Sequence, residues 1–458
     1  MRTGHHSWRS FTVILTLLLT VALLSACSIS IGSVTTQTPA PSASRTAGAT
    51  PGSQGCVPQT KHDDGASDSQ VTYLSPKQFW AIYGIEPLLK QCYTGKGQTV
   101  VVIDSFGSPT LQTDIDQFSD YYGLPRVKLQ IVAPIGTKPF NPNDREMSGW
   151  AGETTIDVQI IHAVAPDANI VVLTSPVDET EGVQGLPEFL QLEQYAAQHY
   201  PGAIVSQSWA ASEVSLADSA GQAEISQFDA FYHTATTTQG MTFFASSGDE
   251  GATDCVSLNS SGDCVPSTTA STGFPNSNPW VTAVGGTTIQ ENGSQFSEVG
   301  WDGSGGGFSR FYPIPSYQQG LPASAQQQLN HRRGVPDVAA SADPTIGLGC
   351  ISSSSGLFAA GGTSAGSPLW AGLAAIANQM AGHPLGFLNP VLYKIAAGPN
   401  YARDFHDVTN GNNSYDQNGV SVPGYDAVPG WDPITGLGTP NAQYLLPDLI
   451  AAVGAGGS

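Results

Sequence analysis

Basic side chains are scarce in this chain of 458 residues. It has 16 Lys and Arg residues against 37 Asp and Glu residues, which gives a formal net charge of −21 at pH 7. A surface of that sign repels phosphate backbones and anionic headgroups, so we expect no nucleic-acid partner and no charge-driven binding to a membrane surface. The length and the hydrophobic content of 40% are sufficient for a large core.

Long apolar runs are also scarce, because only residues 11–24 approach the length that a membrane span needs. Arg2 and Arg9 precede this run, a pattern that is typical of an export signal over residues 1–26. The run ends in the letters LSAC, which resemble a bacterial lipobox. We therefore expect lipidation of Cys27 and an anchor on the outer face of the cytoplasmic membrane, with plain secretion as the alternative.

The composition divides the rest of the chain into three parts. Residues 27–70 are rich in Ser, Thr, Pro, Ala and Gly and are expected to form a flexible tether. Residues 71–450 alternate apolar runs with polar turns and are expected to form one folded domain. Residues 451–458 are expected to be a flexible tail.

Only six cysteines occur, and their spacing suits no zinc site. An exported chain permits disulfides. Cys255 and Cys264 flank a short Ser/Asn/Gly loop and are the expected pair. Cys56 with Cys92 is a second candidate pair, and Cys350 is expected to remain a free thiol or to pair elsewhere.

Strand-like and helix-like segments alternate along the catalytic domain, which predicts a parallel α/β sheet with right-handed crossovers, flanked by helices on both faces. The expected strands are residues 99–103, 127–132, 169–173, 203–208 and 241–245. The expected helices are residues 111–122, 150–163, 187–199 and 223–238.

Residues 361–368 read GGTSAGSP and precede an apolar run. The two glycines allow a sharp turn, and Ser364 then stands where a helix begins. Free N–H groups and the positive end of the dipole at such a position suit a developing oxyanion. The alternative is an ordinary helix cap.

Two carboxyl groups share one face of the helix predicted over residues 150–163. Glu153 and Asp157 are four residues apart, hence about 40° apart around the helix. Like charges at this spacing disfavour double ionisation, so one carboxyl is expected to keep a proton in acid. The alternative is a pair of solvated acids on an exposed face.

A third carboxyl follows a predicted strand. Residues 243–249 read FFASSGD, an apolar run that ends in a turn at Asp249. A turn aspartate that bonds to its own backbone is the alternative to a functional group.

Taken together, these segments resemble the sedolisins, the serine-carboxyl peptidases, from about residue 71 to about residue 449. Further matching segments are 206–209, 274–275, 279–287 and 305–309. The resemblance implies a subtilisin-like fold with Ser364 as nucleophile, Glu153 as general base and Asp157 orienting that base. It implies that a protonated Asp249 helps to form the oxyanion hole. The substrate-lining residues that we expect are Ser206, Ser208, Trp209, Gly305 and Gly306.

A subtilisin triad is the alternative for this fold. Asp104 follows the first predicted strand, where a subtilisin would place its aspartate, but no His-Gly-Thr-His-like segment occurs. His162 lies nine residues after Glu153, about 180° around the same helix. A histidine on the opposite face is expected to be packed or solvated rather than catalytic.

Two segments near the C-terminus resemble the halves of the sedolisin calcium site: 405–409 (FHDVT) and 428–436 (VPGWDPITG). The resemblance implies one structural Ca²⁺ held by carboxylates of Asp407 and Asp432 and by carbonyls of Val408, Val428 and Gly430. Calcium prefers six or more such oxygens. The alternative is a pair of turns that contain aspartate.

We therefore expect an exported, acid-active peptidase that is a monomer and cleaves protein or peptide substrates. A glutamate base with an ordinary pKa near 4.3 accepts protons in acid, where a histidine is already protonated. Sedolisins usually have a large pro-domain, for which residues 27–70 are too short, so unaided folding or help from a separate chain is expected. A catalytically silent binding protein on the same fold and an esterase are the alternative functions.

Overall fold

The computed structural model describes residues 56–68, 70–179, 182–259, 263–292, 295–417 and 419–456. All of them belong to one compact unit, Gln54–Ser458. The predicted signal segment, most of the predicted tether and Cys27 lie outside the described residues. None of the described helices has the length and apolar character needed to span a membrane.

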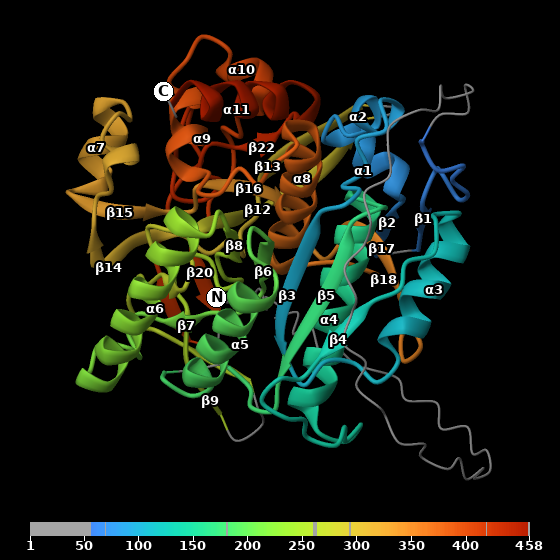
Figure 1. The fold of residues 1–458 in the computed structure, drawn as a ribbon. Helices are drawn as coiled ribbons and strands as arrows, with labels where there is room; N and C mark the ends of the chain where they lie inside the picture. The colour runs from blue at the N-terminus through green and yellow to red at the C-terminus, as the bar shows by residue number, and fades with distance from the viewer. Residues whose placement is uncertain are drawn as a thin grey trace, which may run out of the picture. The chain divides into compact units, whose positions relative to one another are not determined.

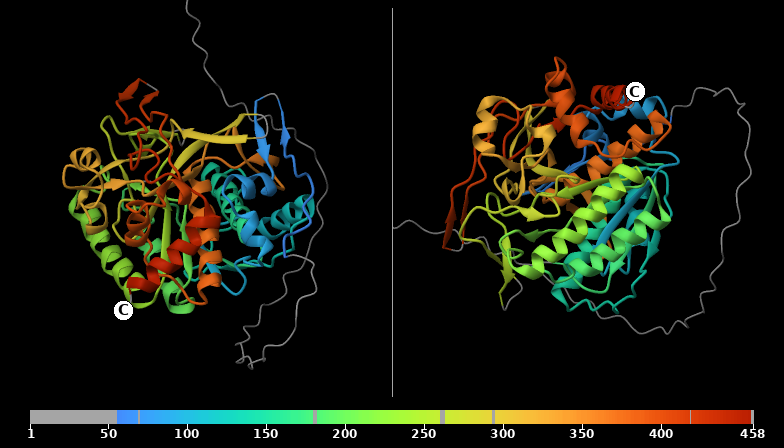
Figure 2. Two further views of the ribbon diagram at one scale, coloured as in Figure 1. Left: turned by 90° about the horizontal axis from the view of Figure 1, so that it is seen from above. Right: turned by 60° about the vertical axis from the view of Figure 1, so that its left-hand side comes forward.

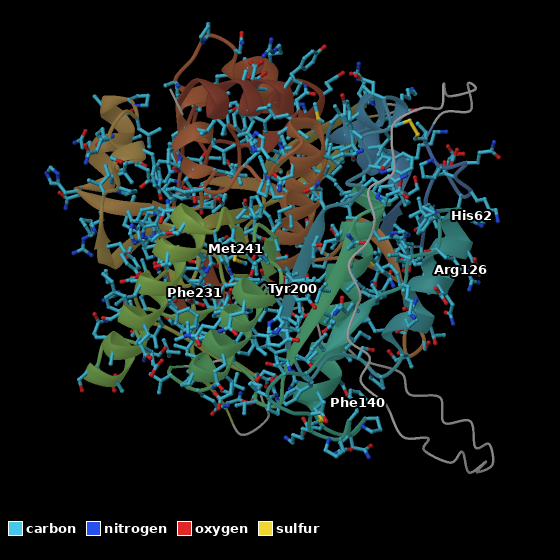
Figure 3. All side chains as sticks on the ribbon, in the orientation of Figure 1. His62, Arg126, Phe140, Tyr200, Phe231 and Met241 are labelled. Atoms are coloured by element: carbon cyan, nitrogen blue, oxygen red, sulfur yellow. A yellow bond between two sulfur atoms is a disulfide. The ribbon has the colours of Figure 1, made fainter. Side chains whose placement is uncertain are left out.

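The folded unit begins earlier than the predicted boundary at residue 71. A disulfide joins Cys56 to Cys92, which confirms the second candidate pair; Figure 3 draws it as a yellow bond beside α1 and α2. The backbone N–H of Lys61 donates to the Tyr122 carbonyl at 2.8 Å. Residues from 56 onward are therefore part of the domain and not of a tether.

The bounds of the elements follow Figure 1. The helices are α1 (Pro76–Ile82), α2 (Glu86–Lys90), α3 (Leu111–Tyr122), α4 (Arg145–Val164), α5 (Leu186–His199), α6 (Ser219–Thr238), α7 (Ala323–Leu329), α8 (Gly366–Ala381), α9 (Asn389–Ala396), α10 (Tyr401–Asp404) and α11 (Ala442–Gly456), with short 3₁₀ turns η1 (Ser316–Gln318) and η2 (Thr363–Ala365). The strands are β1 (Ala66–Ser67), β2 (Thr72–Leu74), β3 (Thr99–Ser105), β4 (Gln130–Val132), β5 (Asn169–Ser175), β6 (Ile204–Gln207), β7 (Ala211–Ser212), β8 (Thr242–Ser246), β9 (Cys255–Leu258), β10 (Cys264–Pro266), β11 (Gly273–Phe274), β12 (Thr282–Asn292), β13 (Gln295–Gly300), β14 (Gly307–Pro313), β15 (Arg332–Val335), β16 (Val338–Ser341), β17 (Ile346–Ser352), β18 (Gly356–Ala359), β19 (Phe405–His406), β20 (Tyr415–Gln417), β21 (Val420–Val422) and β22 (Thr439–Pro440).

Among the described residues, eight strands form a central sheet in the order β13-β12-β8-β6-β3-β5-β4, with β16 also paired to β12. All of these pairs are parallel except β12 with β13. Strand β3 occupies the middle, where Val102 stands opposite Val172 on one side and Ser206 on the other. The carboxyl ends of β3, β6 and β8 therefore meet at one edge of the sheet.

Helices cover both faces of this sheet. Alternate residues of β3 enter different cores: Val100 and Val102 pack with α3, α4 and α8, while Val101 and Ile103 pack with α5 and α6. The right-hand view of Figure 2 shows α5 and α6, in green, across the second face. A strand that is buried on both faces reads as a continuous apolar run, as residues 100–103 of β3 do. The predicted α/β, subtilisin-like fold class is confirmed.

Most of the predicted elements occur with shifted ends. Helix α3 has the predicted bounds, whereas α4 begins five residues before the predicted start at residue 150. The side chain of Asp144 caps α4 by accepting from the backbone N–H of Met147 at 3.2 Å, and this cap fixes the earlier start. At the other end of the chain, α11 extends into the predicted flexible tail.

The predicted disulfide between Cys255 and Cys264 is wrong for this structure, in which both are free thiols. They lie on the antiparallel strands β9 and β10, but Cys264 stands opposite Leu258 and Cys255 opposite Pro266, across an irregular register. The two side chains are hydrogen-bonded to each other and not covalently joined. Cys350 is a buried free thiol.

Candidate active site

Ser364 stands in η2, the 3₁₀ turn that leads directly into α8. The chain enters this turn through Gly362, whose φ of 79° is a left-handed conformation that favours glycine. A Cβ at Gly362 would also lie 2.4 Å from Oδ2 of Asp249. The glycine therefore lets the serine and the aspartate approach each other at the start of a helix.

The two carboxyl groups of α4 face this serine. One carboxylate oxygen of Glu153 lies within reach of the Ser364 and Ser208 hydroxyls, which act to lower its pKa, and the other, Oε1, is buried with no hydrogen-bond partner among the described residues. The hydroxyl of Ser208 donates to Oδ1 of Asp157 at 2.9 Å, and its oxygen is 3.5 Å from the carbonyl oxygen of Ser364. The side chain of Asp157 is fully buried. The helical spacing read from the sequence thus places both carboxyls on the Ser364 side of α4.

Asp104 is a third carboxyl in the same cluster, and sequence reasoning missed its place there. It follows Ile103 in β3 and is fully buried. Burial raises its pKa to about 7, and its charge in turn raises the pKa of both α4 carboxyls. The signal in the sequence is a lone carboxyl at the end of the apolar run of β3. From the sequence alone, we relate this signal only to a subtilisin triad.

Removal of water is the main reason that the α4 carboxyls hold their protons. Burial, followed by the charge of Asp104, raises the pKa of Glu153 to about 8, against the lowering effect of its hydrogen bond to Ser364. Burial, then Asp104 and Glu153, raises the pKa of Asp157 well above its usual range. Interacting groups of this kind titrate as a set, so the cluster ionises in shared steps.

His162 takes no part in the cluster. Its ring is fully buried, and Nε2 lies 3.1 Å from the hydroxyl of Ser119 on α3. Burial lowers its pKa to about 4. Of the two expectations for His162, packed or solvated, the structure shows the packed one, and no histidine is among the described residues that line the cleft of Ser364.

Asp249 closes the site on the side of η2. Its Oδ1 accepts from the backbone N–H of Thr363 at 2.8 Å and from the Thr363 hydroxyl at 2.9 Å. The residue remains open to the cleft, yet the surrounding walls exclude enough water to raise its pKa. Because both donors contact Oδ1, Oδ2 is the oxygen available to carry a proton.

A cleft of about 250 Å³ contains Ser364 and Asp249. Ser208 and Trp209 line it, as predicted for substrate-binding residues. Three more acidic side chains, which the sequence did not single out, complete its wall: Glu179, Glu250 and Asp254. Burial, with the charge of Asp249 as the next cause, raises the pKa of Glu250 to about 7.

The other predicted substrate residues lie outside the lining of this cleft. The Ser206 hydroxyl is buried and lies 2.9 Å from that of Ser367 on α8, so it ties β6 to the nucleophile helix. Gly305 donates its N–H to the Gly248 carbonyl at 2.8 Å. A Cβ at Gly306 would overlap the Pro433 carbonyl at 1.8 Å. These glycines allow close backbone packing behind the cleft, and the structure does not support a lining role for any of the three residues.

The residues predicted to bind calcium meet in two facing loops. Both carboxylate oxygens of Asp407 lie 3.1 Å from the backbone nitrogen of Gly430. Asp432 accepts from the N–H groups of Ile434 and Thr435 at 2.9 Å, and from that of Val428 at 3.3 Å. Burial raises the pKa of Asp432 to about 7, against the lowering effect of these backbone hydrogen bonds.

No cluster of three or more His, Cys, Asp or Glu side chains suited to a metal occurs within the described ranges. The predicted site needs only two carboxylates, because its other donors are backbone carbonyls. Val408 is buried directly after Asp407, and Val428 and Gly430 precede Asp432 in one loop, where Gly430 contacts Asp407. The residues present therefore fit a calcium ion.

The chain is similar in sequence to known proteins from bacteria and from mammals. No family model matches the chain. Kumamolisin of Bacillus sp. (strain MN-32) is 34% identical over 365 residues, which are 78% of this chain and 60% of that protein. Human tripeptidyl-peptidase 1 is 33% identical over 321 residues, 66% of this chain and 52% of that protein. The chain thus spans between half and two thirds of the length of these relatives.

A solved structure of Pseudomonas sedolisin, a serine-carboxyl proteinase, gives a TM-score of 0.67 with 28% sequence identity. The superposition covers 85% of this chain and 100% of that one.

Proposed function

This chain belongs to the sedolisin family, and from that premise we propose that it is a serine-carboxyl peptidase that hydrolyses peptide bonds in acid. The observation that carries the proposal is the contact of Glu153 with Ser364, with Asp157 and Ser208 in the same hydrogen-bonded group. A hydroxyl with a buried carboxyl as its hydrogen-bond partner is the arrangement that general-base activation of a nucleophile requires.

In the first step, the Ser364 oxygen attacks the carbonyl carbon of the substrate while Glu153 takes the hydroxyl proton. Collapse of the tetrahedral intermediate breaks the C–N bond, and Glu153 returns that proton to the departing amine. The product is an ester of Ser364, which water hydrolyses with Glu153 again as the base. Asp157 positions Glu153 through the shared Ser208 hydroxyl.

Asp249 is assigned to the oxyanion. It donates a hydrogen bond only while protonated, and the raised pKa of this group keeps the proton in acid. Because Thr363 occupies Oδ1 with two donors, the proton belongs on Oδ2, beside Gly362. The backbone N–H of Ser364 is the second proposed donor.

The acid optimum follows from how the cluster shares its charge. In acid, Asp104 and Asp157 remain neutral, so the charge repulsion that raises the pKa of Glu153 is absent. The first ionisation of the cluster is then favoured on Glu153 by the Ser364 hydroxyl, since the single proton of Ser208 is directed to Asp157. Activity begins when this single charge forms and declines when Asp249 also ionises.

Calcium and export are part of the proposal. Asp407 and Asp432 would supply carboxylates to one Ca²⁺, and the carbonyls of Val408, Val428 and Gly430 would complete the site. The ion would hold the C-terminal loops together and takes no part in the chemistry. The disulfide Cys56–Cys92 agrees with an exported protein, and we propose a lipid anchor at Cys27, with protein or peptide substrates and a monomeric enzyme.

The test is cleavage of an unfolded protein from pH 2 to pH 8, with products identified by mass spectrometry. Wild type is compared with Ser364→Ala, with Glu153→Gln and with Glu291→Gln, which removes an exposed carboxyl on β12. We expect acid activity in wild type and in the Glu291 variant only. The fragment lengths distinguish endopeptidase action from tripeptide release. Absence of cleavage by folded, calcium-loaded wild type would contradict the proposal and favour a binding protein.

A further inference from the structure

The arginines of this acidic protein divide into two groups. Of the six that the structure describes, four form ion pairs with carboxylates within 4 Å; these are Arg126, Arg145, Arg333 and Arg403. The other two, Arg310 and Arg332, make no such pair with any described residue, although acidic residues outnumber basic ones by 37 to 16. Both line the same cavity.

This cavity has a volume of about 380 Å³ and lies where β14 and β15 pair. Its wall includes the rings of Phe308 and Tyr425, which pack edge to face at 5.3 Å, and no acidic side chain. Nη2 of Arg310 donates to the Thr269 hydroxyl at 3.0 Å and to the Ala270 carbonyl at 3.1 Å. These bonds fix one guanidinium against the wall, and both guanidinium groups remain charged at every working pH.

Glu213 is close enough to Arg310 for the guanidinium charge to act on its pKa, but the two side chains form no ion pair. Glu213 accepts a hydrogen bond from the Ser309 hydroxyl at 2.6 Å and another from the backbone N–H of Arg310. Its hydrogen bonds are therefore with the strand and not with a guanidinium group. The cavity keeps two positive charges that face solvent.

Two short chain connections place this cavity beside the catalytic cleft. The N–H of Gly305 donates to the carbonyl of Gly248 in the cleft wall, and Phe308 of the cavity follows Gly305 by three residues, hence by at most about 10 Å at 3.3 Å per residue. Separately, the hydroxyl of Thr253, the neighbour of Asp254, contacts the carbonyl of Thr269 beside the cavity at 3.4 Å. An extended peptide bound at Ser364 would cover that distance in roughly three to five residues.

From this arrangement we infer that the Arg310–Arg332 cavity binds a carboxylate of the peptide substrate, three to five residues from the bond that is cleaved. The inference rests on the proposed peptidase function. The carboxylate is either an Asp or Glu side chain or the C-terminal group of the peptide. Guanidinium groups match the planar carboxylate, and the site offsets the repulsion between an acidic substrate and the acidic enzyme.

The experiment uses dodecapeptides of one cleavable sequence that differ by Glu or Gln at successive positions on each side of the cleaved bond. A second pair differs by a free or an amidated C-terminus. We measure kcat/KM at pH 5 with wild type, Arg310→Gln, Arg332→Gln and Arg126→Gln. The same peptides, fluorescently labelled, are titrated against the Ser364→Ala protein, so that binding is read without cleavage.

Arg126→Gln is the matched control, because it removes the same charge. Arg126 is exposed and lies on the opposite edge of the domain from β14 and β15 (Figures 1 and 3). Arg332→Gln is the cleaner test variant, since its guanidinium makes only a long bond of 3.4 Å, to the Ser309 carbonyl, within the described structure. Loss of Arg310 also removes the bonds to Thr269 and Ala270.

We expect wild type to prefer Glu, or the free terminus, about fivefold at one position, with the preference reduced by added salt. Arg332→Gln should abolish most of that preference, whereas Arg126→Gln should retain it. Equal cleavage and binding of both members of every pair would overturn the inference while leaving the peptidase intact. If no peptide is cleaved but the Glu peptides still bind more tightly, the anion site stands and the peptidase proposal fails.

Discussion

Two regions of the molecule contain buried carboxyl groups with raised pKa values, and they differ in what surrounds the oxygens. Next to Ser364 of the cleft, Glu153 and Asp157 contact hydroxyl groups and interact with the charge of a third acid, Asp104. In the C-terminal loop, the two oxygens of Asp432 accept from three backbone N–H groups and from the Thr435 hydroxyl. Burial raises the pKa of Asp104 and of Asp432 alike to about 7.

The difference shows that burial alone does not decide how a carboxyl is used. Fixed N–H donors stabilise the ionised form, so the loop favours a charge that a cation then neutralises. Hydroxyl groups both donate and accept, so the cleft permits a proton to move among its members. We therefore interpret the cleft as a site of proton transfer and the loop as a site of cation binding.

The largest expected effect tests whether the cleft is the reactive region. Ser364→Ala should lower kcat for peptide hydrolysis by about 10⁴-fold or more, because the nucleophile is lost. Ser367→Ala, which removes a hydroxyl from the same helix that contacts only β6, serves as the control and should remain within a few fold of wild type. Equal losses in the two variants would mean that the helix and not the nucleophile had been tested.

The second effect concerns proton sharing. Glu153→Gln should reduce kcat by about 10²- to 10⁴-fold, as expected for loss of a general base. Asp104→Asn should leave the acid limb of kcat/KM near its wild-type position, because Asp104 is already neutral where Glu153 first ionises. The measurement is kcat/KM across pH 2 to 8, and a clear shift of the acid limb in Asp104→Asn would show that Asp104 is charged there and would contradict a single shared charge.

The third effect concerns the loop. A chelator should lower the melting temperature of wild type by several degrees, since an ion at 1,000 times its Kd contributes about 4 kcal/mol. Asp432→Asn should show the same loss and should no longer respond to the chelator. Asp416→Asn, on exposed β20, is the control that should respond as wild type does. An unchanged melting temperature of wild type after chelation, measured by calorimetry, would contradict the proposed calcium site.

The smallest expected effect concerns His162. This buried group stays neutral by losing a proton, whereas the buried carboxyls stay neutral by keeping one. Burial lowers the pKa of His162 to about 4 from an ordinary value of about 6.5. The unfolded chain therefore takes up the proton first, so stability is fully present above pH 6.5 and declines as the pH falls to 4. The loss is about 3 kcal/mol.

His162→Gln should flatten that part of the curve of unfolding free energy against pH, as measured by urea denaturation. The cleft carboxyls have the opposite sign, because their pKa values are raised in the folded state. Their contribution is present below the ordinary carboxyl pKa of about 4 and is lost as the pH rises through 7 to 8. A steeper acid-side slope in His162→Gln would contradict the assignment.

The sequence predicted those parts of the fold and site that depend on local spacing. The four-residue interval placed Glu153 and Asp157 on one face of α4, and the two glycines before Ser364 placed it at the start of α8. The buried run of β3 indicated a central parallel strand. Each of these features depends on residues within one turn or one strand of each other.

What the sequence did not reveal depends on how distant segments pair. Asp104 joins the cleft because β3 lies between β5 and β6, an order that local patterns do not determine. Cys255 and Cys264 flank a short loop, yet the register of β9 and β10 leaves them out of direct opposition. Arg310 and Arg332 are brought to one cavity by the irregular pairing of β14 with β15.

The most direct measurement of the central claim is the intact mass of enzyme quenched during turnover at pH 4. The account predicts that wild type gains the mass of the acyl half of the substrate, that peptide mapping locates this adduct on Ser364, and that Glu153→Gln accumulates it much more slowly. Turnover by Ser364→Ala, or an adduct on any other residue, would contradict the assignment of Ser364 as a nucleophile activated by a carboxylate.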